Sequence, residues 1–214
     1  MRFELTSKDY ADYIRKAYAF IHEKGDYITD LDSATGDGDH WININMGFEK
    51  LVEAADELEQ KSIFEEFKQI GTIMMSVIGG SSGVLYGSAY LAAAKVLKDK
   101  ETIGNEELLQ VLDAMLQAIM SRGNAQVGWK TMIDSLAPAV DCYRECITKG
   151  VDERTKKKKV KQAAIDGAES TKAMEAVRGR ATYQTNKGIG HLDPGAVTMS
   201  YQIAILMDCV IEKC

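Results

Sequence analysis

Three carboxylates, Asp32, Asp37 and Asp39, lie close together in a glycine-rich stretch that ends at His40. Crowding acids costs like-charge repulsion and desolvation, and an apolar core does not offset that cost. A hard divalent cation removes it, because carboxylate oxygens are the ligands that Mg²⁺ and Ca²⁺ prefer. The stretch therefore favours a metal site, with a polar, helix-capping turn as the alternative. An EF-hand is excluded, because a loop counted from Asp30 or Asp37 has the wrong residue types at its fifth, sixth and twelfth positions.

A second glycine-rich segment, residues 79–83, precedes an apolar helical pattern. Its glycines let an anion approach the backbone, Ser81 and Ser82 add hydroxyl donors, and a helix start offers unpaired N–H groups. The alternative is a glycine cap that ends one helix and a serine cap that begins the next. Beside an acidic metal site, phosphate binding is the better interpretation. A Walker P-loop is not present, because Trp129 interrupts the frame before Lys130 and no strand precedes it.

A third group of polar residues lies near the carboxyl end, where Arg178 and Arg180 are followed by His191, Asp193 and Pro194. Arginine side chains can balance the charge of a polyphosphate, and Pro194 suits the first position of the last helix. A solvated helix end is an equal alternative for the arginines, and a structural turn is an equal alternative for His191 and Asp193. By themselves these residues do not decide between the two roles.

The elements that must position these residues are helical throughout. The chain has only two prolines, and its β-branched residues are scattered instead of alternating. Apolar periodicity predicts an all-α protein with a single domain spanning residues 1–214. We expect eight helices, at about residues 7–24, 41–59, 63–77, 82–97, 106–122, 130–149, 152–174 and 195–213.

Four connections carry the unusual residues, and they follow the first, third, fifth and seventh helices. They are residues 26–40, 79–83, 123–130 and 176–194, all rich in glycine. In an up-and-down antiparallel bundle, every odd-numbered connection lies at the same end. The sequence therefore predicts that motifs far apart along the chain meet at one rim of the bundle.

Bulk properties narrow the possible partners and location. The chain has 214 residues, 45% of them hydrophobic, and a net charge of −6. This charge argues against a general nucleic-acid or anionic-membrane binder. The amino-terminal residues contain no apolar signal core, and we expect no apolar run long enough to span a bilayer. Cys142, Cys146, Cys209 and Cys214 are interpreted as reduced thiols, so we expect a cytoplasmic protein.

Six motifs, in order along nearly the whole chain, carry a resemblance to a known family. They are Gly36-Asp37-x-Asp39-His40, Asn43-x-Asn45-x-Gly47-Phe48, Gly79-Gly80-x-Ser82-Gly83, Ser121-Arg122-Gly123, Lys130-Thr131-Met132-x-Asp134 and Gly188-x-Gly190-His191-x-Asp193-Pro194-Gly195. The combination resembles the DhaL family, the nucleotide-binding subunit or domain of dihydroxyacetone kinases. This resemblance implies a closed barrel of eight antiparallel helices with the nucleotide at one rim.

The resemblance also implies an activity, cofactors and partners. A chain of this length is similar to the subunit of the bacterial phosphotransferase-system-dependent enzyme, a phosphotransferase with an alcohol group as acceptor. In that enzyme ADP stays bound as a cofactor and is recharged to ATP by a phosphocarrier, DhaM. The γ-phosphate then passes to dihydroxyacetone held on a separate subunit, DhaK. Phosphoryl transfer requires from a protein mainly positioning and charge neutralisation, which metal ions and fixed hydrogen-bond donors provide.

Carried over by position, the resemblance assigns roles to single residues. Asp32, Asp37 and Asp39 would hold two magnesium ions, and with His40 and Arg180 they form the expected catalytic set. Residues expected to contact the phosphates are His40, Asn43, Ser81 and Ser82. Those expected to line the adenine and ribose end are Gly123, Met132, Arg180, Asp193, Pro194 and Gly195. Trp41, Ile42, Gly80 and Thr131 complete the expected nucleotide-contacting set.

Several positions depart from the family pattern. Trp41 stands where glycine or alanine is usual, Trp129 where aspartate is common, and Val84 where proline is usual. Val177-Arg178 stands where basic residues are usual. The two tryptophans either anchor a partner at the rim or pack inward beside the nucleotide, with neither favoured.

Two other functional classes remain open at this point. One is a non-catalytic Mg-ADP-binding adaptor or regulatory paralogue, and the other is a kinase subunit with a different small hydroxy-ketone acceptor. An acidic, Ca²⁺-stabilised helical domain is a more distant alternative.

Overall fold

The computed structural model describes residues 3–213, and the regular elements in that range are all helices, apart from one isolated bridge between Leu5 and Ile103. The expected all-α class is therefore confirmed. The helices are α1 (Ser7–Glu23), α2 (Gly25–Ser33), α3 (His40–Glu53), α4 (Ala55–Leu58), α5 (Ile63–Val77), α6 (Gly80–Val96), α7 (Asn105–Gly123), α8 (Ile133–Thr148), α9 (Glu153–Ser170) and α10 (Pro194–Glu212), with 3₁₀ turns η1 (Thr171–Ala173) and η2 (Arg180–Tyr183).

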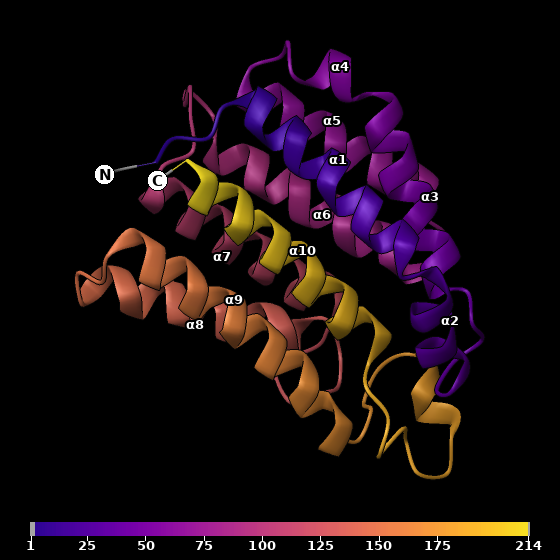
Figure 1. Cartoon of the computed structure of the whole chain (residues 1–214). Helices are drawn as coiled ribbons and strands as arrows, with labels where there is room; N and C mark the ends of the chain where they lie inside the picture. Colours follow the sequence, from indigo (N-terminus) through magenta and orange to yellow (C-terminus); the bar gives the residue numbers. More distant parts are fainter. Residues whose placement is uncertain (1–2, 214) are drawn as a thin grey trace.

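The long helices pack in a circuit. α1 contacts α3, α3 contacts α5, and each later helix contacts the next until α10 returns to α1; α10 also contacts α8. Figure 1 shows the long helices running side by side, with α2 and the loop after η2 at one end of the molecule. The start of α1 and the end of α10 lie at the other end, where Lys213 forms a 2.6 Å ion pair with Asp9.

The predicted count of eight helices was too low for the described residues, because it missed two short ones. Helix α2 overlaps the stretch 26–40 that we expected to be a loop, which leaves only residues 34–39 of that stretch without helix. Its local signal is weak, since it begins at a glycine after Lys24, which cannot accept a capping bond. Tertiary packing supports it instead, because a Cβ at Gly25 would lie 2.8 Å from the Trp41 ring. The expected single helix at residues 41–59 is instead two helices, α3 and α4, which are separated at Ala54.

Helix α10 corrects the expectation that no apolar run is long enough to span a bilayer. It has 19 residues, and an 18-residue window reaches a mean hydropathy of 1.3. By length and composition it could cross a membrane, so the statement that no apolar run has that length was wrong. Its apolar side chains pack in the protein interior, because 67% of that window is buried, and α10 contacts α1, α8 and α9 among its neighbours. A helix that is apolar on most sides is typical of a protein core.

Close packing of α5 on α6 fixes where the second glycine-rich segment lies. A Cβ on Gly83 would lie 2.2 Å from the Ile78 carbonyl oxygen, and one on Gly87 would lie 2.9 Å from that of Gly71. Only glycine permits this approach of the two backbones. It holds the first turn of α6, and with it Ser81 and Ser82, at the rim.

The cysteines agree with the expected reduced state. Cys142, Cys146 and Cys209 are free thiols, and Cys214 lies outside the described residues.

Candidate functional site

One cavity of about 520 Å³ opens at the rim that carries α2, and all four glycine-rich connections line it. Asp37 and Ser82, 45 positions apart in the chain, both border it, so the expected convergence of distant motifs is confirmed. The expected site residues that line the cavity are Asp32, Asp37, Asp39, His40, Ser81, Ser82, Gly123, Thr131, Met132, Arg180, Asp193, Pro194 and Gly195.

The acidic cluster consists of Asp32 on the last turn of α2 and of Asp37 and Asp39 in the loop that follows. One carboxylate oxygen from each lies within 4.8 Å of the others. Asp32 is 8% exposed, whereas the other two carboxylates face solvent. Three oxygen donors this close fit a hard cation, since Mg²⁺ is held at about 2.0–2.1 Å by carboxylates and water. Arg180 already supplies one positive charge there, with Nη2 2.6 Å from Oδ2 of Asp37.

Gly36 lets the chain turn tightly around the Asp32 carboxylate. Its amide donates to the Asp32 carbonyl oxygen at 2.5 Å. A Cβ at this position would lie 2.5 Å from Oδ1 of Asp32. The requirement for glycine here is therefore steric, because a larger residue would collide with a carboxylate of the acidic cluster.

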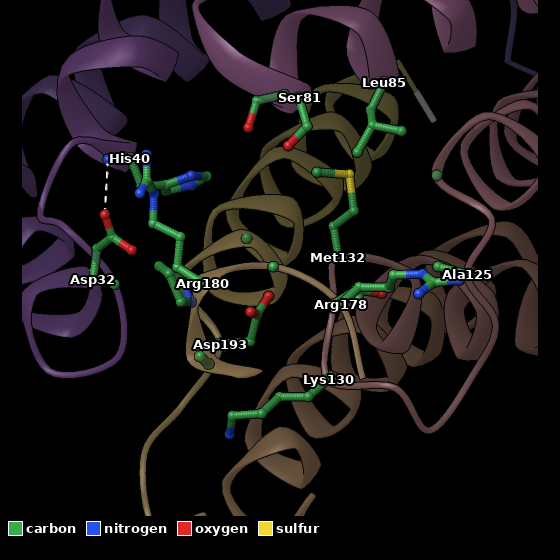
Figure 2. A pocket seen from close by; sticks show the side chains of 18 of the residues that line it. Asp32, His40, Ser81, Leu85, Ala125, Lys130, Met132, Arg178, Arg180 and Asp193 are labelled. Carbon is green, nitrogen blue, oxygen red and sulfur yellow. Dashed lines mark hydrogen bonds between the residues drawn. The ribbon is translucent and has the colours of Figure 1, made fainter. Parts of the chain in front are cut away.

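His40 begins α3 and is held from two directions. Its backbone amide donates to Oδ2 of Asp32 at 3.0 Å, the bond drawn in Figure 2. Its ring nitrogen Nε2 lies 2.9 Å from Oγ1 of Thr198 on α10. Burial lowers the pKa of the His40 ring, and the charges of Asp32 and Asp39 act in the opposite direction.

Helix starts at the cavity have the groups that suit an anion. α3, α6 and α10 all begin there, with first-turn N–H groups and the positive ends of their dipoles. At α10 the side chain of Asp193 caps the helix by accepting from the Ala196 amide at 2.8 Å. At α6 the capping position is Gly79, which has no side chain to occupy the N–H groups of Ser81 and Ser82. The α6 start is therefore the better place for a phosphate.

The far side of the cavity is apolar, and sequence reasoning found only part of it. Leu85, Ile119 and Ala125 line it beside the expected Met132. Figure 2 shows Leu85, Met132 and Ala125 away from Asp32 and His40. An apolar slot of this kind suits the flat face of a nucleobase. Leu85 and Ile119 carry no signal that separates them from ordinary core residues of their helices.

Lys130 was missed as a lining residue, although it lies in a motif that we identified. It is 2% exposed and has a positive φ of 59°. Its Nζ donates to the carbonyl oxygens of Thr171, at 2.6 Å, and His191. Burial lowers its pKa, while the charges of Asp193 and Asp134 raise it. The lysine therefore ties the last loop to the start of α8, and its placement after a glycine-rich loop was the available signal.

Asp193 combines both roles that the sequence left open. It caps α10 and also lines the cavity. Burial raises its pKa to about 7, against the lowering effects of the Ala196 amide and of Lys130. His191 is exposed and contributes its backbone carbonyl oxygen to Lys130.

The two tryptophans take different positions. Trp41 packs inward, where its Nε1 donates to the Ile21 carbonyl oxygen at 3.2 Å. Trp129 is partly buried and stacks with Arg178, whose Cζ lies 5.1 Å from the ring centroid. Arg178 lines the cavity and also donates from Nε to the Asn124 carbonyl oxygen at 2.9 Å. The Trp129–Arg178 pair thus joins the third and fourth connections at the rim.

Four residues of the expected nucleotide-contacting set do not line the cavity, namely Trp41, Ile42, Asn43 and Gly80. The Trp41 side chain is committed to Ile21, and Ile42 is 60% exposed. Because both lie in the first turn of α3, backbone N–H groups are what they can offer a ligand. The Asn43 side chain lies against Gly79, where a Cβ would be 2.8 Å from its Oδ1, and Gly80 has a positive φ of 63° just before Ser81.

Comparison with known proteins shows relatives that match most of the chain. The chain is 39% identical over 193 residues to "PEP-dependent dihydroxyacetone kinase 1, ADP-binding subunit DhaL" of Listeria innocua, covering 90% of this chain and 89% of that protein. It is 31% identical over 202 residues to "PEP-dependent dihydroxyacetone kinase, ADP-binding subunit DhaL" of Escherichia coli, covering 94% and 96%.

Solved structures agree on the fold. The native dihydroxyacetone kinase of C. freundii superposes with a TM-score of 0.73 at 23% identity, over 92% of this chain and 34% of that one. The same kinase in complex with AMP-PNP and Mg²⁺ gives a TM-score of 0.71 at 24% identity, over 92% and 33%. This chain therefore corresponds to about a third of each of those longer chains. A family profile described as the DAK2 domain matches residues 34–208. The chain belongs to the DAK2-domain family.

Proposed function

We propose that this chain is the nucleotide-binding, phosphoryl-transfer subunit of a dihydroxyacetone kinase, a single domain that spans residues 1–214. The observation that carries the proposal is the cavity at the rim, which brings the three carboxylates and the uncapped start of α6 together. Carboxylates suit Mg²⁺, helix N–H groups suit phosphate, and the apolar slot suits a base. The names of the relatives from Listeria innocua and Escherichia coli support the same function.

In this proposal each part of the cavity has a separate task. Asp32, Asp37 and Asp39 hold two magnesium ions, which supply positive charge where the transferred phosphoryl group becomes more negative. Ser81, Ser82 and His40 hold the phosphates of ADP or ATP, and Arg180 balances charge from the last loop. Leu85, Ile119 and Met132 hold the base.

The proposal includes two protein partners. A DhaK-like subunit holds dihydroxyacetone, and a DhaM-like phosphocarrier recharges the bound ADP. The assembly is cytoplasmic and binds neither nucleic acid nor membrane, which the net charge of −6 supports. The rim is the surface that offers the nucleotide to both partners, because the cavity opens there.

Calorimetric titration of ADP with and without magnesium tests the binding half of the proposal. We expect tight, magnesium-dependent binding at one site per chain. Binding that does not change when magnesium is withheld would contradict the assigned role of the acidic cluster.

Turnover tests the catalytic half. The Mg-ADP-loaded chain, incubated with a DhaK-like subunit, a DhaM-like carrier, its phosphate donors and dihydroxyacetone, should form dihydroxyacetone phosphate. A chain that binds Mg-ADP but forms no product, with either dihydroxyacetone or other small hydroxy-ketones, would be an adaptor and not a kinase subunit.

A further inference from the structure

A hydrogen-bonded line of buried side chains leads from the cavity into the core. The His40 ring lies 2.9 Å from Oγ1 of Thr198. One turn further along α10, Nε2 of Gln202 donates to the Thr198 carbonyl oxygen at 3.1 Å and to the Tyr86 hydroxyl at 2.8 Å. Thr198, Gln202 and Tyr86 are 0%, 5% and 1% exposed. Polar groups are costly in an apolar core unless they are paired, so a network that ends on a site residue needs an explanation.

The direction of the His40–Thr198 bond depends on which acceptor takes the single proton of the Thr198 hydroxyl. A threonine hydroxyl has one proton and can also accept. Oγ1 of Thr198 lies 3.2 Å from the Gly195 carbonyl oxygen, which can only accept, so that oxygen is one available partner for the hydroxyl proton. With the proton in that bond, Oγ1 accepts from the histidine, and the histidine proton is on Nε2. Nδ1 is left as the ring nitrogen that a ligand can engage.

Thr198 itself does not line the cavity, and its hydroxyl contacts two residues that do, His40 and Gly195. The histidine is fixed at its backbone by Asp32 on α2 and at its ring by Thr198 on α10. Three helices therefore set the orientation of one ring. A group that fixes both the tautomer and the rotation of a site histidine influences what that histidine binds.

We propose that Thr198 is a positioning residue. Its hydroxyl accepts a hydrogen bond from Nε2–H of His40, which leaves Nδ1 as the ring nitrogen that contacts the phosphates. The consequence for nucleotide binding rests on the proposed function. The tautomer does not, because it is a property of the chain without any ligand.

Two substitutions of Thr198 separate the contribution of its hydroxyl group from the contribution of its side-chain packing. Thr198→Val keeps the shape and removes the hydroxyl, and Thr198→Ser keeps the hydroxyl. ¹⁵N NMR of the histidine rings reports the tautomer, and His40→Ala assigns the signal among the three histidines. We expect Nε2–H for His40 in the wild type and in Thr198→Ser, and loss of that preference in Thr198→Val. Mg-ADP affinity should fall about tenfold in Thr198→Val and be restored in Thr198→Ser.

A double substitution completes the test. In a His40→Ala background, Thr198→Val should cause no further loss of Mg-ADP affinity, since its effect passes through His40. An Nδ1–H tautomer in the wild type would overturn the proposal, and so would an equal loss from Thr198→Val with and without His40. If the wild type binds no Mg-ADP at all, the proposed function fails while the NMR measurement still decides the role of Thr198.

Discussion

Nη2 of Arg180 lies 2.6 Å from Oδ2 of Asp37, so the last rim loop already places a cation against the acidic cluster. The two residues are far apart in sequence, and their side chains are 62% and 36% exposed, so this pair adds little to stability. Under the proposed function its role is positioning, because a guanidinium held at this point would face the phosphates of a nucleotide in the same cavity.

Arg180→Gln should therefore reduce phosphoryl transfer much more than nucleotide binding. We expect turnover with the partner subunits to fall about 10²-fold, as when a fixed donor to the transition state is removed. Mg-ADP affinity, measured by calorimetry, should change much less. The matched control is Arg178→Gln, because Arg178 lines the same cavity but is engaged with Trp129 and Asn124. Equal losses of turnover in the two variants would remove the special role of Arg180.

Asp37→Ala should abolish retention of the nucleotide. The substitution removes one of three carboxylates whose oxygens lie within 4.8 Å of one another, and the phosphates then lose their bridging cation. The measurement is the amount of ADP that co-purifies per chain. Asp30→Ala is the control, since Asp30 is an exposed acid on the same helix α2 but outside the cluster. ADP at wild-type stoichiometry in the Asp37 variant would refute the assigned role.

Gly36→Ala should weaken magnesium binding with little loss of stability. The added methyl would lie 2.5 Å from Oδ1 of Asp32, so that carboxylate must move. We expect magnesium affinity, followed through ADP binding at varied magnesium, to fall by on the order of tenfold. Gly104→Ala at the other end of the molecule is the control, with its nearest neighbour the flexible Glu107 side chain at 3.1 Å. An unchanged magnesium dependence in Gly36→Ala would show that Asp32 is not a ligand.

The convergence of the site could be predicted because it depends on connectivity alone. If helices alternate in direction, the connections after odd-numbered helices share an end, whatever their lengths. Helix α2 adds one element, but the loop it leaves still delivers Asp37 and Asp39 to the same rim.

Features that depend on packing between distant residues could not be predicted. Asp32 was expected in a loop, and it lies on a helix whose first residue is covered by the ring of Trp41. Leu85 and Ile119 follow the same apolar periodicity as their buried neighbours, and only their position at the open end of the bundle makes them a wall of the cavity. The contact of Trp129 with Arg178 joins two loops that are far apart in the sequence, so no local pattern indicates it.

Glu66 provides a test of stability that is independent of nucleotide binding. It is 0% exposed on α5, and neither carboxylate oxygen has a hydrogen-bond partner within residues 3–213. Burial raises its pKa from 4.5 to about 9, and the charge of Glu59 acts in the same direction. The folded state therefore keeps this carboxyl protonated at neutral pH, whereas the unfolded chain ionises above pH 4.5.

The sign of the pH effect follows from this difference. Because the folded state binds the extra proton, Glu66 lowers the free energy of unfolding progressively as the pH rises from about 4.5 to about 9. Glu66→Gln removes that dependence, so it should stabilise the protein at pH 7, by on the order of 3 kcal/mol at most. Urea denaturation at pH 5, 7 and 8.5 measures this, with Glu65→Gln, an exposed neighbour, as the control. The wild-type and Glu66→Gln values should nearly meet at pH 5 and separate towards pH 8.5. Parallel pH profiles would mean that Glu66 is ionised in the folded protein.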